Sequence, residues 1–332
     1  MKDQPADIDE SALRRALTAW KIDAASLTYA PVGFGDHHWT AVDTGGRPWF
    51  VTVADLAYKP HCGTGTRAAY GGLRRAMDTA ASLREDLGFV VAPERTPDGG
   101  TVLRLDERYA VSVFPFLDAT SGEFGQVLDA EERGRVLDLL AELHRAAPPA
   151  SVSVLAPELP SRAALEAALG ELDRPWSGGP YAESARALVT EHAVGFRHRL
   201  AAFDREAAAL RERDAPRVVT HGEPHPGNLL RLGTRPLLVD WDTAGLAVPE
   251  RDLWHVARDA DDLARYAAAS GHVPDPAALT LYRLRWDLDD VSVYLNLFRA
   301  PHTRTADAEQ SWEGLTGTLA RLTGCTDDDA IA

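Results

Sequence analysis

The sequence predicts an α+β fold in which a small antiparallel sheet precedes a larger, mostly helical region. Two observations lead to this prediction. Over residues 1–117, short runs rich in β-branched and aromatic residues alternate with turns that contain glycine and proline. From residue 129 onward, apolar residues recur at helical spacing, with one interruption over residues 217–248. We therefore expect two lobes, residues 1–117 and residues 118–332, joined by a short connector.

The elements of the first lobe follow from local patterns. Residues 9–22 begin with two acids and carry apolar residues at helical spacing, which is typical of a helix. The segment DTGGRP, residues 43–48, lies between two strand-like runs and predicts a hairpin turn. Residues 65–87 predict a helix that is inserted after the third strand. Residues 89–117 predict three further strands.

Composition limits the classes of function. The chain has 332 residues, of which 45% are hydrophobic, so it can bury two sizeable cores. Its formal net charge is −15, which argues against binding a nucleic-acid backbone, because that requires a basic surface. An acidic protein suits a cationic small-molecule substrate, although acidity is also a common route to solubility.

The cysteines and the apolar runs indicate where in the cell the protein is located. Cys62 and Cys325 are far apart and form no metal-binding or disulfide pattern. The first ten residues are polar and acidic, and no run approaches the roughly 20 apolar residues of a membrane span. We therefore expect a cytoplasmic protein that binds neither membranes nor nucleic acids. The sequence leaves its oligomeric state open.

The interruption in the helical region carries a chemical motif. Residues 218–230 read VVTHGEPHPGNLL, and residues 237–245 read LLVDWDTAG. Kinases place an acid and an asparagine on one loop in the pattern H-x-D-x-x-x-x-N, followed by a second acid that binds magnesium. His221, Glu223, Asn228 and Asp240 keep that order and spacing. A plain loop rich in glycine and proline is the alternative interpretation.

These two segments resemble the aminoglycoside phosphotransferase family, which has a protein-kinase-like fold. The segment VLDLLAELHRA also resembles the family's helix after the hinge. VGFGDHHW and RWDLDDVSVYL are similar to the spectinomycin phosphotransferase branch. The resemblance extends from about Pro31 to Tyr294. It implies a bilobal kinase-like fold, and ATP and Mg²⁺ as cofactors.

The resemblance also implies roles for individual residues. Glu223 matches the catalytic aspartate, and His221 matches a histidine that braces the loop. Asn228 and Asp240 match the magnesium ligands, and Asp242 lies close enough to assist. The nucleotide-binding positions implied in the first lobe are Gly33, Phe34 and Gly35 in the hairpin over the phosphates, Thr52 on the third strand, and Phe114 and Phe116 at the hinge.

Two positions depart from the family pattern. The third strand carries Thr52 where the family has a lysine that holds the nucleotide phosphates, and no acidic residue between Asp55 and Asp78 supplies that lysine's partner. The ion pair has therefore been replaced as a unit, and the candidates for the missing charge are Lys59, His37, His38 and Arg67. The second departure is Glu223, which is one methylene longer than aspartate. A displacement of about 1 Å can cost on the order of 100-fold in rate.

A substrate site is expected on a helix of the second lobe. Asp287, Asp290 and Tyr294 fall on one helical face, because they are spaced three and four residues apart. Their oxygens could bind the amines of an aminocyclitol through charge-assisted hydrogen bonds. The alternative is a solvated face that is partly paired with Arg283 and Arg285.

Three hypotheses for function remain. The first is an ATP-dependent O-phosphotransferase that acts on an aminoglycoside-like, cationic antibiotic and so confers resistance. The second is a pseudokinase, a nucleotide- or metabolite-binding module without turnover, which Thr52 and Glu223 favour. The third is a kinase of an ordinary amino alcohol or sugar. The retained metal ligands favour the first and third hypotheses.

Overall fold

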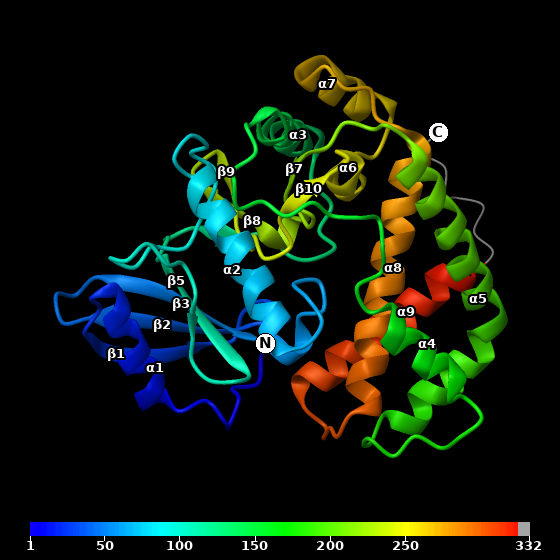
Figure 1. Cartoon of the computed structure of the whole chain (residues 1–332), viewed down its shortest axis with the longest axis horizontal. Helices are drawn as coiled ribbons and strands as arrows, with labels where there is room; N and C mark the ends of the chain where they lie inside the picture. The colour runs from blue at the N-terminus through cyan, green and yellow to red at the C-terminus, as the bar shows by residue number, and fades with distance from the viewer. Residues whose placement is uncertain (325–332) are drawn as a thin grey trace. The chain divides into compact units, whose positions relative to one another are not determined.

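A five-stranded antiparallel sheet forms the first part of the chain in the computed structural model, which describes residues 1–324 (Figure 1). Its spatial order is β1-β2-β3-β5-β4. The strands are β1 (Ala24–Ala30), β2 (His37–Asp43), β3 (Pro48–Asp55), β4 (Leu103–Arg104) and β5 (Tyr109–Pro115). The expected α+β fold class is confirmed.

The predicted hairpin turn joins β2 to β3. The Asp43 carboxylate accepts hydrogen bonds from the main-chain N–H groups of Gly45 and Arg47, each at 2.9 Å, and so holds the turn. One sequence expectation differs from the structure. The first of the three strand-like runs in residues 89–117 is irregular, and Val90 makes only a single parallel bridge, to Leu238. Only the later two runs form β4 and β5.

Helix α1 (Glu10–Leu17) covers one face of this sheet, followed by the short 3₁₀ helix η1 (Thr18–Trp20). The apolar side of α1 packs on alternate residues of the central strands, including Trp39, Val51 and Val113. Because side chains alternate along a strand, the intervening residues His38, Thr52 and Ser112 share the opposite face, where β2, β3 and β5 pair them in register.

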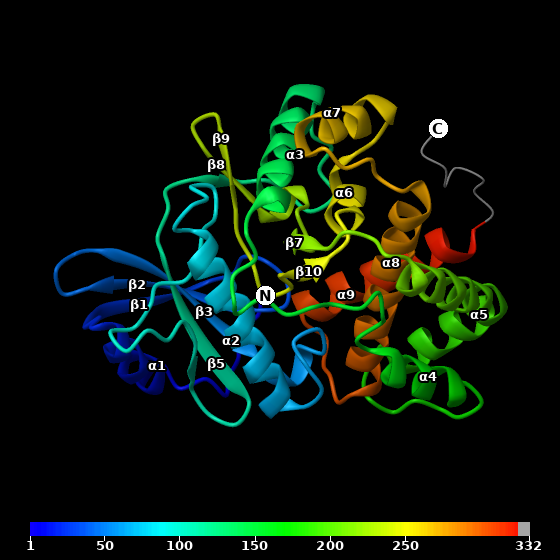
Figure 2. The ribbon, with the colours of Figure 1, turned by 45° about the horizontal axis from the view of Figure 1, so that its top comes forward.

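A 3₁₀ helix and a long helix follow β3. Helix η2 (Leu56–Tyr58) leads into α2 (Thr66–Leu83), which lies beside the sheet near β5 (Figure 2). The Tyr70 hydroxyl donates to the carbonyl of Val102, and the Arg104 guanidinium donates to the carbonyl of Thr66. These contacts fix α2 against the segment that leads into β4, as expected for a helix inserted after the third strand.

The chain divides into two compact units. The first contains residues Met1–Leu155 and Pro216–Val273, and the second contains residues Ala156–Ala215 and the chain from Pro274 onward. Beyond the sheet, the first unit contains β6 (Thr120–Ser121), α3 (Ala130–Arg145), β7 (Val218–Thr220), η3 (Pro226–Asn228), β8 (Leu229–Leu232), β9 (Arg235–Leu238), β10 (Gly245–Ala247), α6 (Glu250–Val256) and α7 (Ala260–Ser270). The expected lobe boundary at residues 117–118 falls inside this unit and stays a prediction.

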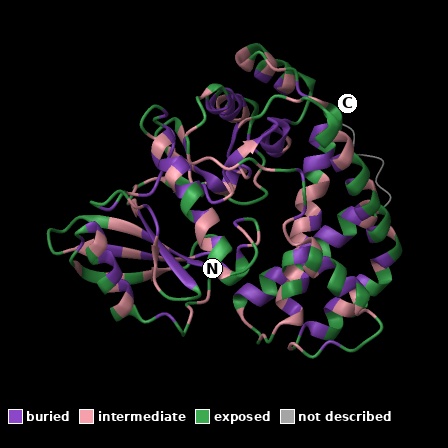
Figure 3. Ribbon diagram, in the orientation of Figure 1, coloured by how far each residue is buried: buried purple, intermediate pink, exposed green. Residues whose placement is uncertain are grey.

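Within the described residues, helices are the only regular secondary structure of the second unit. It consists of α4 (Arg162–Gly170), α5 (Ala182–Glu212), α8 (Pro276–Arg299) and α9 (Ala306–Thr323). Their apolar faces enclose one core, whose largest fully buried members are Phe196 and Phe298. Figure 3 shows buried and exposed residues alternating along α5, as expected for an amphipathic surface helix. Within residues 1–324, no helix combines the length and apolar character that a membrane crossing requires.

Candidate active site

The loop that carries Glu223 is fixed by a buried carboxylate. Asp252, on α6, is fully buried and accepts hydrogen bonds from the main-chain N–H groups of His221 at 2.8 Å and Gly222 at 2.6 Å. It also binds His144 Nε2 at 3.0 Å. Burial by itself would raise the pKa of Asp252, but the hydrogen bond from His144 and the neighbouring charge of Arg251 together outweigh it, so the pKa is lowered. Asp252 is therefore a positioning residue that holds the loop as an anion.

His221 braces the same loop from within, as the sequence predicted. Burial lowers its pKa to about 4, so the imidazole is neutral. Its Nε2 donates to the carbonyl of Val239 at 2.9 Å, and its Nδ1 accepts the N–H of Glu223 at 3.2 Å. The ring also packs edge-on against Trp241, with centroids 4.7 Å apart. His221 thereby ties the Glu223 loop to the segment that carries Asp240 and Asp242.

The two expected metal ligands lie at adjoining positions. Strands β8 and β9 form a hairpin, and the N–H of Val239 donates to the carbonyl of Asn228 at 3.0 Å. The Asn228 amide nitrogen donates to the carbonyl of Glu223 at 2.9 Å, which leaves its side-chain oxygen for a cation. Asp240 has a φ of 65°, in the left-handed region that a side chain rarely adopts. Such strain is concentrated at functional sites.

Lys59 joins the first lobe to this cluster. Its Nζ lies 2.9 Å from Asp36 Oδ1 and 2.5 Å from Asp242 Oδ2, and all three side chains are buried. Asp36 follows the glycine-containing hairpin, whereas Asp242 is 183 residues from Lys59 in sequence. The expected site residue Asp242 thus binds the very lysine that the sequence offered as one of four replacement cations.

The charges in this cluster are strongly perturbed. Burial by itself would lower the pKa of Lys59, but the carboxylates of Asp242 and Asp36 raise it well above its usual value. Burial would raise the pKa of Asp242, but Lys59 and His61 outweigh it, so Asp242 stays ionised. Desolvation, followed by the charge of Asp242, raises the pKa of Glu223. The site therefore holds more carboxylates than neighbouring cations and favours an added cation.

The donor set fits a hard divalent cation such as Mg²⁺. Asn228, Asp240 and Asp242 offer amide and carboxylate oxygens, the ligands that Mg²⁺ prefers in proteins. Asp240 is exposed to solvent, whereas Asp242 is buried. A metal held by Asp240 would therefore stay accessible to a ligand that arrives from solvent. Such an ion would reduce the mutual repulsion of the carboxylates.

Thr52 occupies the strand position where the family has a lysine, and His38 lies opposite it on β2. Their side chains bind each other across β2 and β3, with His38 Nδ1 3.1 Å from Thr52 Oγ1. Desolvation lowers the pKa of His38 to about 3, so this imidazole is neutral and supplies no charge. Arg67 lies exposed in the first turn of α2, and His37 lies 3.4 Å from the Tyr29 hydroxyl. Lys59, by contrast, contacts the carboxylates of Asp36 and Asp242.

Two glycines shape the hairpin over the site. Gly33 and Gly35 have φ values of 70° and 103°, which glycine adopts without strain. Phe34, between them, is exposed, as is Phe116, and Phe114 lies half-buried on β5 opposite Phe50. The nucleotide-binding roles of these residues and of Thr52 stay predictions.

The expected substrate residues lie in the second unit, on α8. Asp287 pairs with Arg321 of α9 at 2.8 Å, and Arg285 pairs with Asp289 at 3.2 Å. Desolvation, followed by the charge of Asp290, raises the pKa of Tyr294. The Tyr294 hydroxyl fits closely against Gly314 of α9, where an added Cβ would lie 2.5 Å from it. The helix itself is confirmed, and the substrate role of the three residues stays a prediction.

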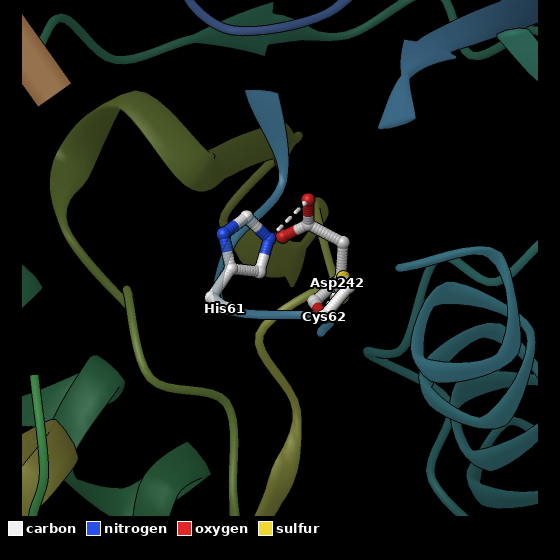
Figure 4. Close-up of side chains that lie close together, drawn as sticks. All are labelled: His61, Cys62 and Asp242. Atoms are coloured by element: carbon white, nitrogen blue, oxygen red, sulfur yellow. Dashed lines mark hydrogen bonds and ion pairs between the residues drawn. The ribbon is translucent and has the colours of Figure 1, made fainter. Parts of the chain in front are cut away.

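Sequence reasoning missed several residues of this cluster. No motif spacing in the sequence pointed to Asp36, His61, Cys62 or Asp252. His61 Nε2 lies 3.1 Å from Asp242 Oδ2, and Cys62 Sγ lies 3.5 Å from the carbonyl of Asp242 (Figure 4). The one available cue was the segment KPHC, in which proline after lysine favours a tight turn.

That turn is held against α2 by a glycine. The N–H of Cys62 donates to the carbonyl of Lys59 at 3.0 Å, which closes the turn. The Cys62 carbonyl then approaches the main chain of α2 so closely that a Cβ added to Gly72 would lie 1.8 Å from its oxygen. Only glycine fits at this contact, which sets the position of Lys59 relative to the sheet.

Substituting Gly72 by alanine should therefore displace the Lys59 turn. We expect a loss of about 1–3 kcal/mol in the free energy of unfolding, which is typical of overpacking, and weaker nucleotide binding. Gly71→Ala is the matched control, because its Cβ would meet only Arg75 Nη1, at 3.6 Å. It should gain up to about 1 kcal/mol from helix propensity. Urea unfolding of both variants checks this, and equal stabilities would refute it.

A comparison with known proteins identifies the family of this chain. The model of the phosphotransferase enzyme family, APH, matches residues 31–282. The chain belongs to the phosphotransferase enzyme family. The resemblance seen in the HGE and VDWD segments is thereby confirmed. Protein StrN of Streptomyces griseus is 31% identical to this chain over 257 residues, which cover 72% of this chain and 74% of StrN.

Solved structures support the kinase-like fold of this family member. The complex of spectinomycin phosphotransferase APH(9)-Ia with ADP and spectinomycin superposes with a TM-score of 0.70 at 15% identity, covering 96% of this chain and 98% of that one. The amicoumacin kinase hAmiN, in complex with AMP-PNP, Ca²⁺ and Ami, gives a TM-score of 0.59 at 13% identity, covering 96% and 94%. At these identities the likeness shows the fold alone.

Proposed function

We propose that this protein is a cytoplasmic, ATP- and Mg²⁺-dependent O-phosphotransferase that acts on a cationic small molecule with a free hydroxyl group. The observation that carries the proposal is the buried cluster in which Lys59 meets Asp36 and Asp242 beside the Glu223 loop. The complexes of its structural neighbours with ADP, AMP-PNP and Ca²⁺ support the use of a nucleotide and a divalent cation.

Each residue has a distinct task in the proposed reaction. Glu223 accepts the proton of the acceptor hydroxyl while that oxygen forms a bond to the γ-phosphorus and the bond to ADP breaks. Asn228 and Asp240 would hold Mg²⁺, which neutralises phosphate charge when bound. Lys59 exchanges its Asp242 partner for a nucleotide phosphate and so takes over the role that Thr52 cannot perform. The net charge of −15 supports a cationic acceptor.

A pseudokinase is the second candidate, favoured by Thr52 and Glu223. The two candidates separate in one experiment. Calorimetry measures ATP binding with and without Mg²⁺, and a coupled ADP-release assay then screens cationic antibiotics, amino alcohols and sugars. We expect Mg²⁺-dependent binding and turnover with an aminocyclitol-like acceptor. Asp240→Asn is the negative control, because it removes a metal ligand.

The outcomes of this experiment are distinct. Binding without transfer to any acceptor would favour the pseudokinase. Transfer only to an amino alcohol or sugar would favour the metabolite kinase. Absence of nucleotide binding in the wild-type protein would overturn both kinase-type proposals.

A further inference from the structure

The turn Lys59–Cys62 brings the side chains of His61 and Cys62 close to Asp242. Both side chains can bind metals, and neither has a role in the proposed phosphoryl transfer. His61 Nε2 lies 3.1 Å from Asp242 Oδ2, and Cys62 Sγ lies near the Asp242 main chain (Figure 4). One ligand atom from each of these three residues lies within 4.8 Å of the other two. The three side chains come from two segments that are about 180 residues apart in sequence.

The separation of these atoms suits a tetrahedral metal ion. Zinc binds nitrogen and oxygen at about 2.0–2.2 Å and sulfur at about 2.3 Å, so its ligand atoms lie roughly 3.3–3.8 Å apart. Shifts of about 1 Å would bring the three atoms to that geometry, with water as a fourth ligand. Oδ2 of Asp242 binds Lys59 and His61, and within residues 1–324 Oδ1 takes no hydrogen bond, so it is available as a ligand.

The chemistry of the ligands selects the metal. A thiolate and an imidazole are ligands for zinc and its softer neighbours, whereas Mg²⁺ takes oxygen ligands. The oxygen set of Asn228, Asp240 and Asp242 therefore differs from the mixed set of His61, Cys62 and Asp242. The two sets share Asp242.

We propose that His61, Cys62 and Asp242 form a second cation site, specific for Zn²⁺ and similar borderline-soft divalent ions, that inhibits the protein. A metal held there fixes the Lys59–Cys62 turn to Asp242, with Oδ1 on the metal and Oδ2 on Lys59. Lys59 is then kept at Asp242 and cannot exchange this partner for a nucleotide phosphate. The inhibitory part of the proposal rests on the proposed function, whereas metal binding does not.

Metal binding can be measured directly on the full chain, with Co²⁺ as a spectroscopic probe. A thiolate ligand gives cobalt an intense near-ultraviolet charge-transfer band, and Zn²⁺ should displace the cobalt and abolish the band. Cys62→Ser should remove the band and weaken Zn²⁺ affinity by about 100-fold or more, since loss of outer-shell partners alone costs about 10- to 100-fold. Cys325→Ser is the matched control and should retain the band.

A second variant keeps the test decisive if Cys62→Ser folds poorly. His61 has a side chain that is 29% exposed, so His61→Gln should fold and should also weaken Zn²⁺ by at least about 10-fold. A band that persists in Cys62→Ser, or a band in neither the wild type nor Cys325→Ser, would overturn the site.

Inhibition is then measured in the phosphotransferase assay under excess Mg²⁺. Zn²⁺ at concentrations that saturate the cobalt-competition curve should inhibit the wild type and Cys325→Ser, and a chelator should restore activity. Measured against its own activity without Zn²⁺, Cys62→Ser should require at least about 10-fold more Zn²⁺ for the same fractional inhibition. Binding without inhibition would keep the site and overturn its inhibitory role. If no acceptor is ever phosphorylated, Zn²⁺-dependent weakening of ATP binding provides the same comparison.

Discussion

Lys59→Met should lower kcat/KM for the nucleotide by about 10²–10³-fold, the scale on which a preorganised charge stabilises a transition state. The structure gives the physical reason. Lys59 contacts the site carboxylates of Asp36 and Asp242, whereas Thr52 is neutral and His38 has a lowered pKa. The measurement is ATP affinity by calorimetry together with steady-state turnover. Lys2→Met removes the same charge at an exposed position and should leave both quantities unchanged.

Returning a lysine to the strand tests the assignment more sharply. Thr52→Lys in the Lys59→Met background should recover part of the lost activity, because Thr52 occupies the strand position where the family has its lysine. Thermal unfolding must accompany the assay, since removing one partner of a buried ion pair can cost about 3–5 kcal/mol. If folded Lys59→Met binds and turns over ATP as the wild type does, Lys59 is only a structural ion-pair partner.

Glu223→Gln should reduce turnover by about 10²–10⁴-fold with little change in ATP affinity, since the acid acts on the acceptor. Glutamine keeps the size of the side chain but cannot accept a proton. The loop cannot move easily to compensate, because Glu223 is held through its N–H by His221 and through its carbonyl by Asn228. Glu142→Gln, at an exposed position of α3, is the matched control and should leave turnover and ATP affinity unchanged.

A shorter acid at position 223 distinguishes the effect of the negative charge from the effect of side-chain length. Glu223→Asp keeps the carboxylate but shortens the side chain by one methylene, so it should retain at least about tenfold more activity than Glu223→Gln. Single-turnover phosphoryl transfer measures both variants without interference from product release. Full activity in Glu223→Gln would show that Glu223 has no catalytic role.

Local patterns were sufficient for much of the fold. The DTGGRP turn specifies its hairpin because Asp43 binds two main-chain N–H groups within four residues of itself. Helix α2 follows from apolar spacing within a single segment. The strand expected at the start of residues 89–117 was wrong, because the apolar run that includes Val90 is buried as irregular chain with a single bridge to Leu238. A short apolar run does not distinguish these environments.

The sequence by itself identified the segments of the candidate site, because His221, Glu223 and Asn228 lie on one loop and Asp240 follows on the next hairpin. It also identified Lys59 as one of four candidates for the missing cation. Only the tertiary structure brought Lys59, His61 and Cys62 to Asp242, about 180 residues away. That contact depends on how the turn after β3 packs against Gly72 and on how β9 ends. Periodicity and spacing describe neighbours along the chain, so they carry no information about such a meeting of distant segments.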